Sequence, residues 1–310
     1  MTRRFSYLPF LNGNYSTAPG LSPINKGINE EDRVVFQLDE QYENYLLNKR
    51  LCRAEDIRKY YHEHNLKLST IRRVNEFIAK QLAQEYPDIF LFAKSDSLQI
   101  FRNERTQETL RWDTENHSLE GEAYLSLFDA LCCQVQEDVA VFQLEGERDW
   151  LSAIHLCSPN YWSPADKVGK PFHLVHFPVP EMDRTLQHYP KMLRSIVNSE
   201  TPHTRFAWGI TTDNRLNHHP EPPQEKNPAD WHGKGAEAKQ FFVRAERQNL
   251  VGFPDENAFL FTIKTYFYEI NDLNRVEKDA LLSALMSMTP RTLAYKGLTP
   301  ILEVLKEQLA

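Results

Sequence analysis

Two histidines stand three residues apart in the segment 170–180, which reads KPFHLVHFPVP. His173 and His176 lie beside aromatic residues, and the prolines that follow His176 favour a stiff, extended backbone there. A histidine held in one direction is suited to bind a metal ion or to exchange a proton near neutral pH. The alternative is a core histidine whose hydrogen bonds are satisfied within the protein, and the local sequence taken alone favours it.

A second group of candidates lies in the segment 241–251, FFVRAERQNLV, which alternates as a β-strand does. The period of two places Arg247 on one face with Phe241, Val243, Ala245, Asn249 and Val251, and Arg244, Glu246 and Gln248 on the other. A buried arginine requires a partner, either a cofactor carboxylate or an internal ion pair with Glu246. An edge position would also explain Arg247. Arg205 and Lys264 lie on neighbouring predicted strands and extend this positive patch.

Several motifs that carry catalysis elsewhere are missing from the sequence. It has no serine–histidine or cysteine–histidine nucleophile signature, no P-loop and no GxGxxG. Its cysteines are Cys52, Cys132, Cys133 and Cys157, and no two of them form a CxxC pair, which argues against a zinc or iron–sulfur site. The chain therefore carries no motif for a reducing cofactor of its own.

Composition narrows the class of protein. The chain has 310 residues, a formal net charge of −7 and no long basic run, which argues against nucleic acid or an anionic membrane as the main partner. No apolar run approaches the length of a bilayer span, and the N-terminus lacks the apolar region of a signal peptide. We therefore expect a cytoplasmic protein with reduced cysteines.

The first 135 residues are predicted to form a mostly helical region that packs on the rest of the chain. An ordered arm over 1–38 precedes helical patterns from Asp39 onward, near 54–64, and from Ser69 to Pro87. Short strands are predicted within 88–112, and a further helix within 124–135. These elements form a layer ahead of the segment that contains the histidines.

Residues 136–310 are predicted to form a sheet with helices inserted between its strands. Two strands within 138–157 precede a helix over 181–199 that Pro190 should kink, and three strands come next within 205–270. A polar insertion over 213–239 holds His218, His219 and His232, and helices close the chain. This order is typical of a PAS fold. We therefore predict an α+β protein with a PAS-like, antiparallel, five-stranded sheet and a helical N-terminal layer.

Several segments, taken in order, resemble one known family, the haem-dependent oxidative N-demethylase alpha subunits. They are YLPFLNGNY, PGLSPI, DEQYENYLLNKR, QVQEDVAVF, LCSPNYWSPADKVGKPFHLVHFPVP, TRFAWGI, FFVRAERQNLVGFPDENAFLFTIKTY and LAYKGL. The resemblance implies a PAS-like domain that holds haem b and oxidises a small secondary amine such as dimethylamine with dioxygen. It also implies that a separate NADPH-dependent reductase with flavin and iron–sulfur centres delivers the electrons.

The resemblance also implies roles for particular residues. The histidine of the family's HxPVP element falls on His176, which becomes the first choice for the iron ligand; His155, His173 and His188 remain alternatives. The RxExQ element falls on Arg244, and the RxxW element on Arg205, where Ala207 replaces the usual asparagine. At least one of Arg244 and Arg247 is expected to bind a haem propionate, with Lys264 and Arg205 as weaker candidates.

Two functions remain open at this point. The first is a monooxygenase-type N-demethylase, whose catalytic residues the sequence leaves unknown. The alternative is a haem-binding PAS-type sensor or carrier that does not turn over, because a fold does not decide a function. The sequence does not identify the amine, the reductase or the oligomeric state.

Overall fold

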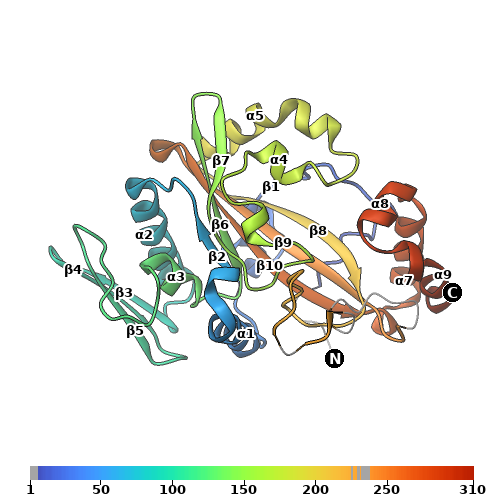
Figure 1. Cartoon of the computed structure of the whole chain (residues 1–310), viewed down its shortest axis with the longest axis horizontal. Helices are drawn as coiled ribbons and strands as arrows, with labels where there is room; N and C mark the ends of the chain where they lie inside the picture. Colours follow the sequence, from blue (N-terminus) through green and yellow to red (C-terminus); the bar gives the residue numbers. More distant parts are fainter. Residues whose placement is uncertain (1–5, 225, 229–230, 232–237) are drawn as a thin grey trace.

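The computed structural model describes residues 6–224, 226–228, 231 and 238–310. An antiparallel sheet of seven strands runs through the centre of the molecule (Figure 1), in the order β1-β8-β9-β10-β6-β7-β2. These strands are β1 (Ser22–Pro23), β2 (Tyr61–Glu63), β6 (Asp138–Glu145), β7 (Arg148–His155), β8 (His203–Thr211), β9 (Phe242–Phe253) and β10 (Ala258–Glu269).

The sheet is larger than the five-stranded one predicted, because two short strands from the N-terminal region extend it. The predicted five are its long strands β6 to β10, and they lie in the order β8-β9-β10-β6-β7. β1 pairs with the outer edge of β8, and β2 pairs with the outer edge of β7. An unpaired strand edge presents backbone N–H and C=O groups without partners, and β1 and β2 supply hydrogen bonds to some of these groups.

The two faces of the sheet pack against different elements. One face carries Phe142, Leu250 and Phe259 and packs against Leu193 and Ile196 of α5 (Asp183–Val197); we call it the α5 face. The opposite face carries apolar side chains such as Val141, Val251 and Leu260. It packs against α1 (Tyr42–Asp56) and α2 (Leu68–Glu85), and we call it the α1 face. Strand alternation therefore decides which cover each side chain meets.

The rest of the N-terminal region forms a small second sheet and a short helix. β3 (Phe90–Lys94), β4 (Leu98–Asn103) and β5 (Glu108–Asp113) pair antiparallel, which confirms the short strands predicted within 88–112. α3 (Leu127–Cys132) is shorter than the helix predicted over 124–135. Its N-cap is Ser126, whose side chain accepts a hydrogen bond from the Asp129 N–H, and this cap fixes where the helix starts.

The C-terminal helices close the other end of the α1 face. They are α7 (Arg275–Met286), α8 (Pro290–Tyr295) and α9 (Leu302–Leu309), and they bury Leu281, Leu285 and Leu305 against strands β8 to β10. Asn274 and Glu277 form the capping box predicted for the first of them. Among the described residues, no helix combines the length and the apolar character needed to cross a bilayer.

The backbone around His176 differs from the prediction. His176 is the last residue of a short helix, α4 (Phe172–His176), rather than part of an extended segment. Proline restricts only the residue before it, here Phe177, and that residue still adopts helical angles. The N–H of Val175 donates to Pro171 O at 3.0 Å, and such bonds within the turn hold the helix despite the prolines after it.

Gly252 of β9 allows the end of α5 to lie close to the sheet. A Cβ atom at this position would clash with the backbone oxygens of Ile196 and Val197. We therefore expect Gly252→Ala to lower the free energy of unfolding by about 1–3 kcal/mol, because overpacking forces the backbone to move. Urea unfolding measures the change. Gly209→Ala on β8 is the control, because its Cβ would lie no closer than 3.9 Å to Lys296 Nζ, and an equal loss there would contradict the explanation.

Candidate functional site

His176 presents one ring nitrogen that is fixed and one that has no protein partner. Its Nδ1 lies 2.9 Å from the Phe172 carbonyl oxygen, and the two rings stack at 4.0 Å. A carbonyl oxygen can only accept a hydrogen bond, so Nδ1 must carry the proton and Nε2 must carry the lone pair. No described residue bonds to Nε2. This arrangement is the one by which proteins orient a histidine for a metal.

The electrostatic surroundings keep His176 neutral. Burial lowers the pKa of His176 to about 4, against the opposing effect of the hydrogen bond to Phe172. The positive charges of Arg205 and Lys167 lower it further. A neutral imidazole with an available lone pair is the form that binds a metal, so the side chain is in its ligating state across the physiological pH range.

Arg205 lies near His176 and has no hydrogen-bond or ion-pair partner among the described residues. It stands on the α5 face of β8, opposite Gln248 of β9. Its Nε is buried without a hydrogen bond, and the guanidinium forms no ion pair with any described residue. Burial lowers the pKa of Arg205, although Glu246 is close enough to oppose this. The Arg205 side chain is half-buried, and a partly desolvated guanidinium without an acceptor is a candidate to bind an anion.

Apolar and aromatic side chains surround these two polar groups. Phe142 of β6 and Phe259 of β10 stack in parallel at 5.1 Å, and Phe172 of α4 stacks on Tyr189 of α5 at 5.5 Å. Phe172, Tyr189 and several of their neighbours are only half-buried: Trp162, Val168, Val175, Met192 and Phe261. The α5 face therefore offers incompletely covered apolar surface beside His176.

Two further ionisable groups lie beyond Arg205. Lys296 comes directly after α8 and is half-buried, and its Nζ donates to Trp208 O at 2.7 Å and lies 4.8 Å from the Tyr15 ring centre. Burial lowers the pKa of Lys296 to about 8, although Glu246 opposes the shift. Burial also raises the pKa of Tyr15 to about 12. Neither residue is among the candidates predicted from the sequence, although both fall inside the segments LAYKGL and YLPFLNGNY that carry the family resemblance.

Arg244 shares the α5 face but is already engaged within the protein. Its Nη2 donates to Ser158 O at 2.5 Å, and its Nη1 lies 3.2 Å from His218 Nδ1. Its Nε also reaches Glu246 at 3.4 Å. His218 in turn bonds to Asp213 at 2.8 Å, so this histidine of the polar insertion belongs to the network that holds Arg244. His232 lies outside the described residues.

Arg247 and Lys264 lie on the α1 face, away from His176. Arg247 Nη2 donates to the carbonyl oxygens of Asp32 at 2.9 Å and Val34 at 2.8 Å. Lys264 Nζ donates to Gln37 O at 2.7 Å and pairs with Asp39 at 2.9 Å. The predicted alternation of Arg244 and Arg247 between the two faces is confirmed. The structure does not bring the four predicted cations into one patch.

His155 occupies a buried cluster on the α1 face. Its Nε2 lies 3.1 Å from Asp129 Oδ1 and 3.9 Å from Cys133 Sγ, and these three ligand-type atoms lie within 4.8 Å of one another. The same carboxylate accepts from Arg53 Nη1, 2.6 Å from Oδ2, so a positive charge already neutralises it. His155 Nδ1 lies 3.9 Å from Cys157 Sγ. Both ring nitrogens of His155 therefore face side chains of the protein.

The two remaining histidine alternatives are His173, on α4 with His176, and His188, on α5. His173 Nδ1 lies 3.1 Å from the Tyr189 hydroxyl, and its side chain is half-buried. His188 is exposed on α5. Neither histidine forms the bond from a ring nitrogen to a backbone carbonyl that His176 has.

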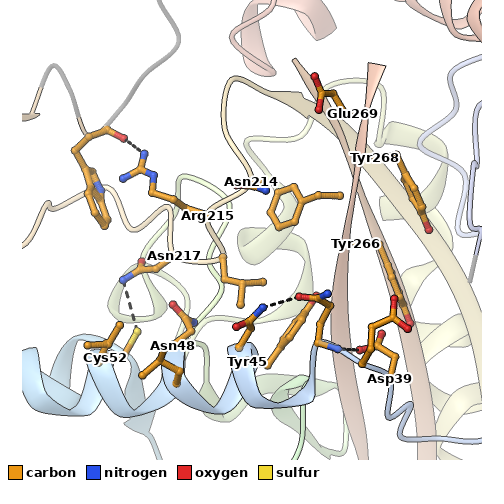
Figure 2. Close-up of a pocket in the computed structure, with 18 of the residues that line it drawn as sticks. Asp39, Tyr45, Asn48, Cys52, Asn214, Arg215, Asn217, Tyr266, Tyr268 and Glu269 are labelled. Atoms are coloured by element: carbon orange, nitrogen blue, oxygen red, sulfur yellow. Dashed lines mark hydrogen bonds between the residues drawn. The ribbon is translucent and has the colours of Figure 1, made fainter. Parts of the chain in front are cut away.

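A cavity of about 960 Å³ lies elsewhere, beside α1 (Figure 2). α1 contributes Tyr45, Asn48 and Cys52, and Asn214, Arg215 and Asn217 come from the segment after β8. Tyr266, Tyr268 and Glu269 of β10 line its other side. None of the described histidines lines this cavity, so it is distinct from the surroundings of His176.

A comparison with protein families gives a match that covers nearly the whole chain. The sequence model described as "Haem-dependent oxidative N-demethylase, alpha subunit-like" matches residues 28–306. The matched range runs from the segment before α1 into α9, so it includes His176, Arg205 and Lys296.

The buried His155 cluster should make stability depend on pH. Burial lowers the pKa of His155, but Cys157 and the hydrogen bond to Asp129 outweigh this and raise it to about 9. The protonated form therefore contributes stability that is complete below about pH 6.5 and lost as the pH rises through about 9. In urea unfolding, we expect the free energy of unfolding to fall over this range by more in the wild type than in His155→Gln. An equal fall in both proteins would contradict the raised pKa.

Proposed function

We propose a function that proceeds from one premise: the chain belongs to the haem-dependent oxidative N-demethylase, alpha subunit-like family. The family description makes it a haem-dependent oxidoreductase. We further propose that it is a monooxygenase-type enzyme that binds haem b and demethylates a small secondary amine with dioxygen. Electrons would come from a separate NADPH-dependent reductase that carries flavin and iron–sulfur centres. Residues 136–310 would form the PAS-like haem domain, with residues 1–135 packed on it, in the cytoplasm.

The observation that carries this proposal is the state of His176. Its Nδ1–H bond to Phe172 O leaves the Nε2 lone pair without a described partner, and the lowered pKa keeps the ring neutral. The donor set therefore fits haem iron, which neutral imidazoles bind. His155 fits less well, because Asp129 and Cys157 face its two nitrogens.

Arg205 is our choice for the partner of a haem propionate. A carboxylate from the cofactor would supply the anion that the buried Nε of Arg205 lacks. Arg244, Arg247 and Lys264 remain candidates from the sequence, but each of their side chains already donates to carbonyl oxygens within the protein. A change of partner there would leave buried acceptors unsatisfied.

Haem, when bound, would supply the redox and dioxygen chemistry that amino-acid side chains lack. The chain's own contribution is binding, exclusion of water and control of protons. His176 would bind the iron, and the aromatic side chains of α4 and α5 would keep water from the site. Lys296, with a pKa of about 8, is suited to hold or release a proton when a protonated amine arrives.

Turnover separates this proposal from the alternative of a haem sensor or carrier. The protein should be loaded with haem, supplied with reducing equivalents from a flavin and iron–sulfur reductase, and given dimethylamine. Amine-dependent oxygen consumption with release of formaldehyde is the expected result. A protein that shows a Soret band but no amine-dependent consumption would be a sensor or carrier, and the absence of a Soret band would reject both functions.

His176→Ala should abolish haem binding or change the iron spin state, because it removes the only ligand we propose on the protein side. The absorption spectrum of the haem-loaded protein measures this. His173→Ala and His188→Ala are the matched controls, since they stand on the same or the next helix and should keep the wild-type spectrum. An unchanged spectrum of His176→Ala would move the ligand to His155, His173 or His188.

Arg205→Met should weaken haem binding by roughly tenfold or more, because a charge-assisted hydrogen bond to a carboxylate contributes about 1.5–3 kcal/mol. The substitution keeps most of the aliphatic volume. Haem titration gives the affinity, and the gain in thermal stability on haem addition should shrink with it. Arg194→Met, on the exposed side of α5, is the control. If only Arg244→Met or Arg247→Met weakened haem binding, the propionate site would be on β9 instead.

A further inference from the structure

β10 is longer than its pairing with β6, and this leaves part of its backbone edge without a neighbouring strand. The pairing with β6 ends where Ile263 meets Asp138, whereas the pairing with β9 continues to Glu269. On the β9 side, the N–H of Ile270 donates to Phe241 O at 2.9 Å. On the other side, the Thr265 carbonyl accepts from the Tyr45 hydroxyl.

These two bonds decide which backbone groups face the open edge. Successive residues of a strand point their N–H and C=O groups to opposite edges. Thr265 points to the open edge, so Phe267 and Glu269 point there as well. Within the part of the chain that the structure describes, no hydrogen bond engages the backbone N–H or C=O of Phe267 on this side.

The 960 Å³ cavity lies against this edge. It is lined by four consecutive residues of β10, from Tyr266 to Glu269. Side chains of consecutive residues alternate between the two faces, so a cavity that touches all four lies along the edge of the strand. Figure 2 places α1 along the opposite wall, with Tyr45 and Asn48 pointing into the space. Because Tyr45 already occupies the Thr265 carbonyl, the open edge runs from Phe267 to Glu269 and is roughly 10 Å long, at about 3.4 Å per residue.

The lining also indicates what would bind. Five acidic residues line the cavity, namely Asp39, Glu40, Glu55, Glu269 and Asp272, against two basic ones, Arg215 and Lys226. Asp39 already pairs with Lys264, Glu55 with Lys59 and Arg215 with Asp213, so the charge selection rests on Glu40 and Glu269. Five side-chain amides add polar groups: Gln41, Asn44, Asn48, Asn214 and Asn217. α1 also exposes Leu47 and Leu51 on this wall, by 47% and 60%. Free backbone groups, acidic walls and exposed leucines together suit an extended basic polypeptide with alternating apolar residues.

We propose that this cavity receives an extended basic segment of a partner polypeptide, which pairs with Phe267 and Glu269 of β10 as an additional strand. The main-chain hydrogen bonds would give affinity, and the carboxylates would select lysine or arginine side chains. The surface is independent of His176, so binding there can be tested apart from haem binding. The family description refers to an alpha subunit, and an alpha subunit implies a partner polypeptide.

The probe is a synthetic hexapeptide, acetyl-KVKVKV-amide, added to the full chain. Saturable binding by calorimetry is expected, together with slower hydrogen exchange of the Phe267 and Glu269 amides. The peptides EVEVEV and KVPVKV are the matched controls, because one reverses the charge and the other interrupts the strand. Equal binding of either control, no binding of KVKVKV, or unprotected amides would overturn the proposal.

Variants of the protein test the charge selection. Glu40→Gln and Glu269→Gln should each weaken KVKVKV binding by about two- to fivefold, in line with exposed ion pairs. Glu43→Gln is the control, because Glu43 is exposed on the same helix but does not line the cavity. If Glu43→Gln weakened KVKVKV binding equally, the effect would come from the net charge of the protein, and the proposed selection of basic side chains by the cavity would be wrong. Protection of the same amides in a peptide-free dimer would overturn the proposal by assigning the edge to a second copy of this chain.

Discussion

Buried positive charge must be matched by acceptors, and in this protein the segment 32–39 supplies them on the α1 face. Arg247 and Lys264 reach across from β9 and β10 to its carbonyl oxygens, and Asn249 Nδ2 donates to Val35 O at 2.7 Å. In the other direction, the Gln37 N–H donates to the buried Glu137 carboxylate at 2.8 Å. Removing any one partner would leave a desolvated group unpaired, so the N-terminal segment and the sheet stabilise each other.

The buried cations of the α1 face are bound by acceptors of the protein, and this explains why the candidate site lies on the α5 face. The strand period sends Arg247 and Lys264 to the α1 face and leaves Arg205 and Arg244 on the α5 face. Arg244 is then held by Ser158, His218 and Thr265. Arg205 receives no comparable set of acceptors among the described residues. Arg247 also has one buried nitrogen without a partner, Nη1, but of these four cations only Arg205 makes no hydrogen bond or ion pair with a described residue, and it lies near a neutral histidine.

Local periodicity could be read from the sequence, whereas contacts between distant segments could not. The alternation in β9 correctly separates Arg244 from Arg247, because a period of two is a property of the strand itself. It does not reveal which face meets α5, and for that reason the sequence favours both of these arginines over Arg205. The prolines after His176 indicate an extended backbone, but the bonds within α4 outweigh that local preference. The edge strands β1 and β2 are too short to give a periodic signal, since pairing partners far along the chain define them.

The open edge of β10 results from where β6 can begin. Asp138, the first residue of β6, accepts the N–H groups of Cys157 at 2.7 Å and Ser158 at 2.9 Å, which anchors that point of the chain to the end of β7. Just before it, Lys49 of α1 donates to the carbonyl oxygens of Cys132 and Glu137, both at 2.6 Å. The backbone there is thus bonded to a helix and cannot extend β6 alongside residues 265–269. Because α1 covers only the start of this edge, through Tyr45, the remaining backbone groups stay open to the cavity. Lys49 bonds α1 to the backbone just before β6, and the edge of β10 at Phe267 and Glu269 is therefore left without a neighbouring strand.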